Sequence, residues 1–349
     1  SEGASDIPFR YRIRNNGADS KFDPDGESIT RFLLPSAEHF TAHPEWYMYD
    51  PEDGEPDKKY TFSFGLEQLK EDPEKLAVAR EHRRLPYQPC MTSEGAMVTA
   101  ANTALERLET EYANLTNPLK VFWVVQQDGK WMCRCANCGR MRDAEGSDSA
   151  SWILFLNYVA ERIEKNYPDV LVGMHAYLHT IQPPASVRPR DNVLVYMAAL
   201  DRDHKLSFGE LVEGEYVKRW CELAKQVWVW DYDTNFRNYI KPHPNHLDMA
   251  RTIRFCRDAG TQGMRIQGAM GRLSDLVYMR NWVNAQMAWN PDKDPDALRA
   301  EFLNGYYGAA GPVLGRYITV LDEIIHRGKG TFLRCYAGST EGWLGLEDL

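Results

Sequence analysis

Residues 121–138 read VFWVVQQDGKWMCRCANC, and this stretch is the most informative of the chain. Its apolar run at 121–125 is typical of a strand in a parallel sheet, because helices cover both faces of such a sheet. The run ends at Gln126, Gln127 and Asp128. In barrels of parallel strands, the residues just past the C-terminal end of each strand build the active site. The stretch therefore predicts a catalytic carboxylate at Asp128.

Strand-like runs alternate with helical segments along the chain, which is the pattern of β/α units and a parallel sheet. We predict strands at 9–14, 85–91, 119–125, 170–175, 193–200, 226–230 and 263–267, and helices at 94–112, 149–166, 211–224, 246–259, 274–289 and 294–307. Seven strands are one short of the eight in a (β/α)₈ TIM-type barrel. We therefore expect an α/β barrel whose first strand would precede residue 1.

The expected domain organisation has two parts. Residues 1–310 would form the barrel, with the polar, proline-rich residues 24–80 as a long loop or insertion. Residues 311–349 would begin a C-terminal helical region, with a helix at 313–325 and a strand-like run at 331–336. The chain stops before that region could complete a domain, so we expect it to be a fragment of a longer protein.

Composition narrows the possible partners. The chain has 349 residues and a formal net charge of −9, so a nucleic-acid-binding surface is not expected. No apolar run approaches the ~20 residues that span a bilayer. The 10 Trp, 18 Tyr and 13 Phe residues would suit a sugar-binding site, although aromatic residues also dominate ordinary cores.

Carboxylates follow several of the predicted strands. Asp128 follows one strand, Asp201 and Asp203 follow another, and Asp231 and Asp233 follow a third. Loop aspartates usually fix turns or cap helices, but their concentration at strand ends favours a shared function. Glycosidic hydrolysis needs one carboxylic acid to protonate the leaving oxygen and a second group as base or nucleophile. The sequence therefore predicts a glycoside hydrolase-like enzyme.

The predicted catalytic roles follow from position. Asp128 is expected to be the general acid, and Trp131 beside it could raise its pKa by excluding water. Asp231 or Asp201 would be the base or nucleophile. No cofactor is expected to take part in this chemistry. The residues predicted to bind substrate are Gln127, Trp131, His175, Tyr177, Arg202, Asp203, Trp230, Asp233, Asn235, Arg265 and Gln267.

The cysteine cluster offers a different chemistry. Cys133, Cys135 and Cys138 lie within six residues, and Cys90 at the end of a neighbouring predicted strand would be a fourth ligand. Four thiolates match a tetrahedral structural zinc site. Disulfides are the alternative if the protein is secreted. In either case the cluster would fasten the loop that follows Asp128.

Five motifs occur here in a combination that resembles a known family. They are HPEWY at 43–47, Gln88-x-Cys90, Gln127-Asp128 with the three cysteines, WDYDTNF at 230–236, and EFLNGYYG at 301–308. The family consists of bacterial, usually exported proteins described only as a domain of unknown function, and it is similar to α-glucuronidases and other (β/α)₈-barrel glycoside hydrolases. The resemblance covers roughly residues 9–340.

The resemblance implies a polysaccharide or oligosaccharide substrate, with uronic-acid-bearing glycans as one class, and an extracellular or periplasmic location. A uronate carboxylate could pair with Arg202 or Arg265 in bidentate fashion. One departure from the family matters, because Ile266 stands where a Glu commonly precedes the Gln-Gly at the end of the last strand. The alternative reading is therefore a catalytically inactive barrel that binds carbohydrate. A metal-dependent hydrolase is a weaker third possibility, because no His-x-His or Glu-x-x-His pair follows a predicted strand.

Overall fold

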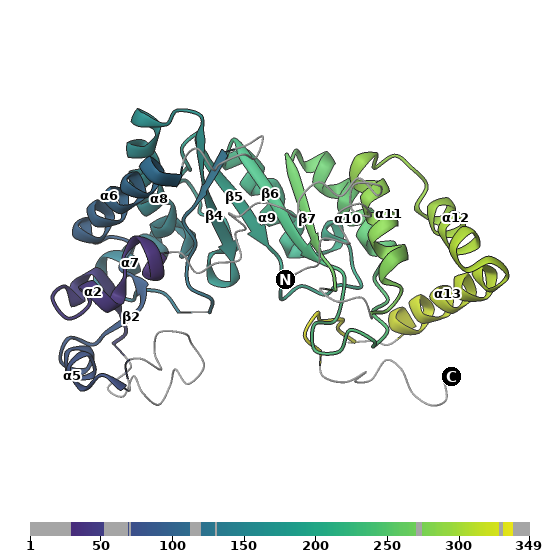
Figure 1. Cartoon of the computed structure of the whole chain (residues 1–349), viewed down its shortest axis with the longest axis horizontal. Coiled ribbons are helices and arrows are strands. Elements are labelled where there is room, and N and C mark those ends of the chain that lie inside the picture. Colours follow the sequence, from purple (N-terminus) through teal and green to yellow (C-terminus); the bar gives the residue numbers. More distant parts are fainter. Residues whose placement is uncertain are drawn as a thin grey trace. The chain divides into compact units, whose positions relative to one another are not determined.

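The computed structural model describes residues 29–51, 69, 71–111, 120–129, 131–269, 274–327 and 331–337 (Figure 1). The chain divides into two compact units. Of the described residues, unit 1 takes 199–218 and those from 228 onwards, and unit 2 takes those up to 198 together with 219–227. The strand predicted at 9–14 lies outside the described residues.

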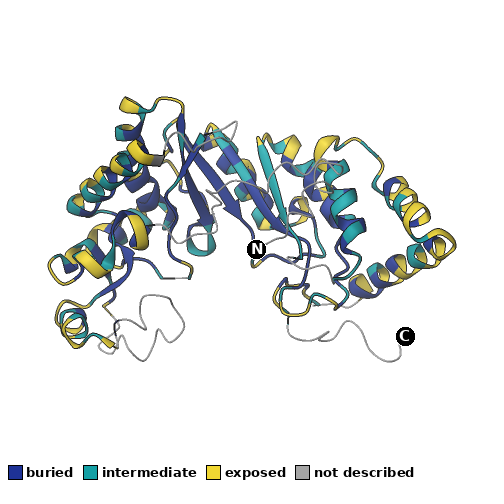
Figure 2. Cartoon of the chain, viewed as in Figure 1, coloured by how far each residue is buried: buried dark blue, intermediate teal, exposed yellow. Residues whose placement is uncertain are grey.

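Unit 2 contains three parallel strands. They are β3 (Lys120–Trp123), β4 (Val170–Tyr177) and β5 (Val193–Ala198), with β4 paired to both of the others. Every residue of β5 is buried, as Figure 2 shows in dark blue, which fits a strand covered on both faces. Gly173 on β4 is opposite Trp123, and a Cβ there would come within 2.3 Å of the Trp123 ring. Glycine at this position therefore makes room for the indole.

Unit 2 has four main helices. They are α5 (Pro73–His82), α6 (Glu94–Glu111), α7 (Ala136–Glu145) and α8 (Ser149–Asn166), of which α8 packs against β4 and β5. In α8 the residues Trp152, Phe155, Leu156 and Val159 recur at helical spacing and are fully buried. This helix contacts both α6 and β4 (Figure 1). Its bounds match the helix predicted at 149–166.

An antiparallel pair lies apart from the parallel strands. It consists of β1 (Tyr47–Tyr49) and β2 (Arg84–Pro89). The sequence predicts a barrel strand at 85–91, which is wrong, because these residues contribute to the antiparallel strand β2 instead. Pro86 and Pro89 lack the N–H groups that a central strand must donate to its neighbours, so this segment suits a short edge pairing.

Unit 1 is built on two parallel strands, β6 (Gln226–Tyr232, from Trp228 onwards in this unit) and β7 (Gly263–Gln267). Its helices are α10 (His246–Ala259), α11 (Val277–Trp289), α12 (Pro295–Tyr307) and α13 (Gly311–Arg327), and α9 (Val212–Leu223) crosses the division between the units. The core joins α10, α11, α12 and α13 through Met249, Ile253, Met279, Val283, Met287, Leu298, Leu303 and Ile318. Asp294 caps α12 by accepting a hydrogen bond from the N–H of Asp296.

Residues 331–336, predicted as strand-like, do not form a strand. Leu333 and Cys335 are buried, but the N–H of Leu333 donates to the Asp203 carboxylate at 2.9 Å rather than to a neighbouring strand. Leu333 and Cys335 are therefore buried without belonging to a sheet, whereas Phe332 and Tyr336 are exposed.

Several short elements complete the described part of the chain. They are the π-helical turn η1 (Ile29–Leu33), α2 (Ser36–His39), and the 3₁₀ turns η2 (Pro44–Trp46), η4 (Leu178–Thr180), η5 (Phe208–Glu210) and η6 (Gly308–Ala310). Ile29, Leu33, Leu34 and Phe40 are fully buried, so the start of the described chain packs into unit 2.

The prediction of an eight-stranded barrel is wrong. The described residues contain five parallel strands, β3 to β7, and the separate antiparallel pair. The α/β class and the five parallel strands were predicted correctly. The 85–91 segment, however, belongs to the antiparallel pair and not to the parallel strands. Among the described residues, no helix combines the length and apolar character needed to cross a membrane.

Candidate functional site

The C-terminal end of β6 carries a buried ion pair in unit 1. Arg202 and Asp231 have fully buried side chains, with Nε 2.9 Å from Oδ1 and Nη2 2.7 Å from Oδ2. The guanidinium also donates to the backbone carbonyls of Asp203 and Leu206. Both oxygens of Asp231, one of the predicted catalytic groups, are therefore occupied by Arg202.

Buried histidines surround this ion pair. The ring of His204 lies 6.0 Å from that of His243, and its Nδ1 lies 3.8 Å from Asp231 Oδ1. Burial lowers the pKa of His204 to about 4, and the positive charge of Arg202 adds to that shift. Burial likewise holds the pKa values of His243 and His246 well below the usual histidine value. These three imidazoles are therefore neutral at pH 7.

Asp233 is the second carboxyl group at the end of β6. Its side chain is buried, and its Oδ2 accepts a hydrogen bond from Asn284 Nδ2 at 2.7 Å. A Cβ on Gly268 would lie 2.8 Å from Asp233 Oδ1, so glycine leaves room for the carboxyl group. Burial raises the pKa of Asp233, and the nearby Arg280 and Asn284 oppose that shift. A carboxyl group with a raised pKa suits proton donation.

A small pocket of ≈ 10 Å³ adjoins Asp233. That volume is close to what one water molecule requires, and it is far too small for a sugar ring. The pocket is lined by Asp233, His246, Met249, Met279, Arg280, Val283, Asn284 and Arg299. It can therefore supply water or a small polar group to the Asp233 carboxyl.

Three of the residues predicted to bind substrate lie together on β6 and β7. Trp230 Nε1 donates to Gln267 Oε1 at 3.0 Å, and the guanidinium of Arg265 lies 4.4 Å from the Trp230 ring centroid. The Tyr232 ring also stacks near Trp230, at 5.7 Å between centroids. These contacts hold the side chains together. They also place Gln267, Arg265 and Tyr232 next to the Trp230 indole.

The other predicted residues of unit 1 have different environments. Asp201 is exposed. Asp203 is buried and pairs with Lys205 Nζ at 3.0 Å. Asn235 is buried, and its side chain donates to the carbonyl of Ala337 at 2.8 Å. Asp203 and Asn235 thus have structural partners, and Asp201 faces solvent.

Asp128 lies in unit 2, in the segment that follows β3, and its side chain is exposed. Trp131 is half-buried and packs edge-on against Tyr87, at 5.6 Å between ring centroids. Gln127 is held more firmly, because its backbone N–H donates to the Gln88 side-chain oxygen at 3.1 Å. The role of Asp128 as general acid stays a prediction.

His175 and Tyr177 lie on β4 of the same unit. The His175 ring packs between Trp123 and Tyr196, at 5.9 and 5.6 Å between centroids. The carbonyl of Tyr177 accepts hydrogen bonds from Gln126 and Thr180. Unit 2 thus brings His175 into an aromatic cluster across three strands, while Tyr177 fixes the turn after β4.

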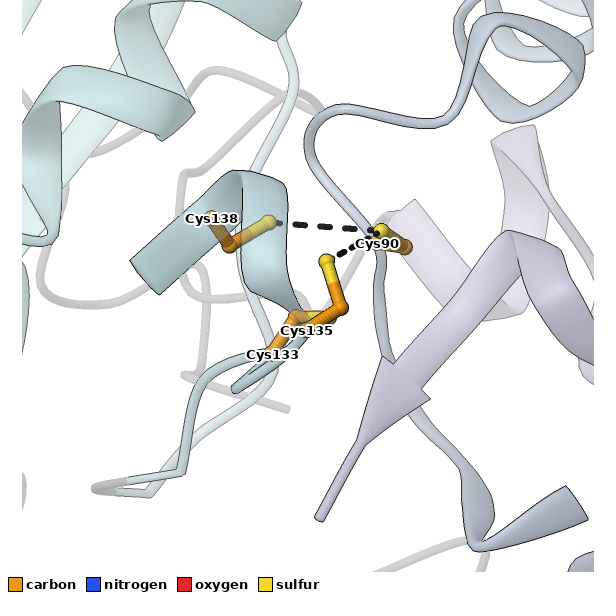
Figure 3. Close-up of side chains that lie close together, drawn as sticks. All are labelled: Cys90, Cys133, Cys135 and Cys138. Atoms are coloured by element: carbon orange, nitrogen blue, oxygen red, sulfur yellow. Dashed lines mark hydrogen bonds between the residues drawn. The ribbon is translucent and has the colours of Figure 1, made fainter. Parts of the chain in front are cut away.

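The four cysteines of the predicted metal site come together in unit 2. Cys90 follows β2, Cys133 and Cys135 precede α7, and Cys138 lies in its first turn. Their sulfur atoms all lie within 4.8 Å of one another, so the cluster could hold a metal ion. Figure 3 shows the side chains converging, with Cys90 Sγ 3.6 Å from Cys135 Sγ and 4.0 Å from Cys138 Sγ.

These distances discriminate between the two predicted chemistries. A disulfide requires sulfur atoms about 2.05 Å apart. Four thiolates around a zinc ion, each with a Zn–S bond of about 2.3 Å, place their sulfurs about 3.8 Å apart. The observed 3.6 and 4.0 Å bracket the zinc value, and all seven cysteines are free thiols.

A second group of possible ligands lies between α10 and α13. Asp248, Asp322 and His326 have ligand atoms within 4.8 Å of one another. However, Arg251 already pairs with Asp248, and both ring nitrogens of His326 lie close to backbone carbonyls, at 2.8 and 3.1 Å. One carboxylate of this group is therefore already paired with Arg251, and both ring nitrogens of His326 have backbone neighbours.

The sequence analysis missed the partners that hold these sites. Asn284 and Arg280 lie on α11, far along the chain from Asp233, and no spacing pattern connects them. Thr92 lies two residues after Cys90 and contacts three of the four thiols, so its proximity to a predicted ligand was an available signal.

The fold and these two sites define an α/β protein with parallel strands, a buried carboxyl group at a strand end, and a four-cysteine cluster. The chain belongs to the family described as Domain of unknown function (DUF4838), whose sequence profile matches residues 5–319. A search of curated proteins found no match to this chain.

Proposed function

We propose that this chain is a glycoside hydrolase-like enzyme that cleaves glycosidic bonds in polysaccharides or oligosaccharides. Asp233 is the observation that carries the proposal, because it combines a strand-end position, burial and a raised pKa. Its role in this proposal is the general acid, which requires the small pocket beside it to widen when substrate binds. The resemblance to exported proteins favours an extracellular or periplasmic location, which is part of the same proposal.

The chemistry depends on a carboxyl group that still holds its proton near neutral pH. Protonating the leaving oxygen requires such a group, and burial of Asp233 raises its pKa in that direction. Asn284 orients the carboxyl through Oδ2, which leaves Oδ1 as the atom that can carry the proton. Arg202 holds Asp231, so in this proposal Asp231 sets the local charge and does not attack the sugar. Water attacks the anomeric carbon instead, and the Asp233 carboxylate, having given its proton to the leaving oxygen, takes a proton back from that water.

A substrate screen tests the proposal. The chain is incubated with neutral and uronic-acid-bearing oligosaccharides, and newly formed reducing ends are measured over time. Release from at least one class, at a rate proportional to protein concentration, is the expected result. No release from any class, in a preparation that is folded by circular dichroism, would count against hydrolysis.

A second candidate function is carbohydrate binding without hydrolysis. The buried pairing of Asp231 with Arg202 favours it, because the pairing takes Asp231 away from catalysis and leaves Asp233, held by Asn284, as the remaining carboxyl group at the end of β6. The resemblance to glycoside hydrolases also implies a Glu at the position that Ile266 occupies here. Calorimetry with the same oligosaccharides separates the two functions, since this alternative predicts saturable binding and no product.

We also propose that the metal ion held by the four cysteines is Zn²⁺ and that its role is structural. Thiolate ligands select thiophilic ions, and four of them leave no open position for substrate or water. In this proposal the ion joins the end of β2 to the start of α7. Elemental analysis of the purified chain would detect the zinc.

A further inference from the structure

The four-cysteine cluster has a layer of hydrogen-bond donors around it. We infer that Thr92, Arg84 and the backbone N–H of Tyr49 form the outer shell of the metal site, and that the Thr92 hydroxyl controls how tightly the ion is held. This inference rests on the zinc occupancy proposed above.

Charge gives the reason that such a shell is needed. A divalent zinc ion with four thiolates carries two net negative charges. Cys90, Cys133 and Cys138 each have at most 4% of their surface exposed, so water cannot freely solvate the charge on their sulfur atoms. Buried charge is costly unless donors or opposite charges are close to it. The protein must therefore supply donors to the sulfur atoms.

The donors to Cys133 come from the β1 and β2 pair. The backbone N–H of Tyr49 donates to Cys133 Sγ at 3.3 Å, and Arg84 Nη1 lies 3.9 Å from the same atom. Arg84 is held in place by donating to the carbonyl of Tyr47 at 2.7 Å. Its guanidinium therefore brings a fixed positive charge to the cluster.

Thr92 serves the other three sulfur atoms. Its Oγ1 lies 3.3 Å from Cys138 Sγ, 3.7 Å from Cys90 Sγ and 3.9 Å from Cys135 Sγ. A metal-bound thiolate has no proton to give, so the hydroxyl must be the donor. A hydroxyl has a single proton, and the shortest distance identifies Cys138 as its acceptor. Outer-shell donors of this kind orient ligands and commonly change metal affinity by about 10–100-fold.

The same contacts fasten the segment that leads to α7. The N–H of Arg134, between two ligands, donates to the carbonyl of Tyr49 at 2.7 Å, and the N–H of Cys90 donates to the carbonyl of Trp46 at 2.7 Å. Metal, outer shell and β1 thus form one connected unit. The role of the short antiparallel pair is to present donors to the site.

The test compares zinc affinity in Thr92→Val and Thr92→Ser. Valine keeps the branched shape and removes the hydroxyl, whereas serine keeps the hydroxyl. Thr110→Val, at an exposed position on α6, is the matched control. The full chain is loaded with Zn²⁺, and its affinity is measured by competition with a coloured chelator after circular dichroism shows that each variant is folded.

We expect Thr92→Val to bind zinc about 10–100-fold more weakly, and Thr92→Ser and Thr110→Val to match the wild type. Wild-type affinity in Thr92→Val would overturn the outer-shell inference while leaving the zinc proposal intact. A wild-type chain that takes up no zinc would overturn both. If Thr92→Val does not fold, Arg84→Gln gives the same comparison at Cys133.

Discussion

Arg202 and Asp231 form a two-point ion pair inside unit 1, with nitrogen–oxygen distances of 2.9 and 2.7 Å and no exposed side-chain surface on either residue. Asp231 follows directly from the apolar run of β6, and Arg202 comes from the loop after β5. Two distant segments of the chain are therefore joined by one contact.

Breaking this pair from one side is expected to be costly. Asp231→Asn leaves a buried guanidinium without its counter-charge, so the free energy of unfolding should fall by about 3–5 kcal/mol. Urea unfolding followed by tryptophan fluorescence measures the loss. Asp292→Asn removes a carboxylate that pairs with Arg257 at the surface, and it should change stability little. Equal effects of the two substitutions would show that the buried pair is not important for stability.

His204 gives unit 1 a specific pH dependence. Its pKa of about 4 in the folded chain lies below the ordinary value of 6.5, so the unfolded chain takes up the proton first as the pH falls. The contribution of His204 to the free energy of unfolding is fully present above pH 6.5 and is lost progressively between pH 6.5 and 4. Asp248 has the opposite effect on the pH dependence of stability. Burial raises its pKa to about 6, so the folded chain takes up this proton before the unfolded chain does.

The His204 contribution is isolated by comparing variants. In urea unfolding between pH 7.5 and 5, His204→Gln should lose less stability on acidification than the wild type, because it has no proton to take up. His82→Gln, at an exposed position on α5, should follow the wild type. An unchanged pH dependence in His204→Gln would exclude a neutral buried imidazole.

Two helical glycines should respond oppositely to alanine. A Cβ on Gly214 in α9 would lie 2.0 Å from the backbone oxygen of Phe208, and that oxygen cannot move as a side chain can. Gly214→Ala should therefore destabilise by at least about 1–3 kcal/mol. Gly305 in α12 has nothing within 4 Å of the added atom, so Gly305→Ala should stabilise by about 0.5–1 kcal/mol. The melting temperature should fall in Gly214→Ala and rise in Gly305→Ala. An unchanged melting temperature in Gly214→Ala would contradict the packing of α9 against η5.

Removing the metal should loosen unit 2. If zinc joins Cys90 to the start of α7, a strong chelator should lower the melting temperature and make four additional thiols reactive towards a thiol reagent. Cys138→Ser should reproduce this effect without chelator. Cys221→Ser, outside the cluster, should retain the wild-type response to chelation. Thiol reactivity that is identical with and without chelator would mean that no ion protects the cluster.

The sequence predicted the regular elements well where hydrophobic periodicity was strong. The helices at 149–166 and 246–259 and the strand at 263–267 agree with α8, α10 and β7 at both ends. The two helices have clear buried apolar faces, and glycine or polar residues adjoin the ends of all three segments. Local pattern was sufficient there because packing and propensity favour the same structure.

The errors have physical causes. The run at 85–91 is as apolar as a barrel strand, but its two prolines limit it to pairing with β1. In the run at 331–336 only Leu333 and Cys335 are buried, and the N–H of Leu333 donates to the Asp203 side chain instead of to a strand. Composition alone does not say where the backbone hydrogen bonds of a segment go.

For the candidate site, sequence spacing located ligands but not their partners. The four cysteines were predicted as one cluster, and they are one. The predicted catalytic Asp231 was identified as a strand-end carboxylate, but its burial against Arg202 depends on a contact between distant residues. The same is true of Asn284 and Asp233.

The most direct test of the account is the turnover of Asp233→Asn on the best substrate from the oligosaccharide screen. Asparagine preserves the shape of the side chain and removes the proton that the acid must donate. We predict a fall in kcat of about 100-fold or more with binding retained, and loss of the high-pH decline that the wild type should show. Wild-type turnover in Asp233→Asn, with the same pH profile, would contradict the proposed role of Asp233.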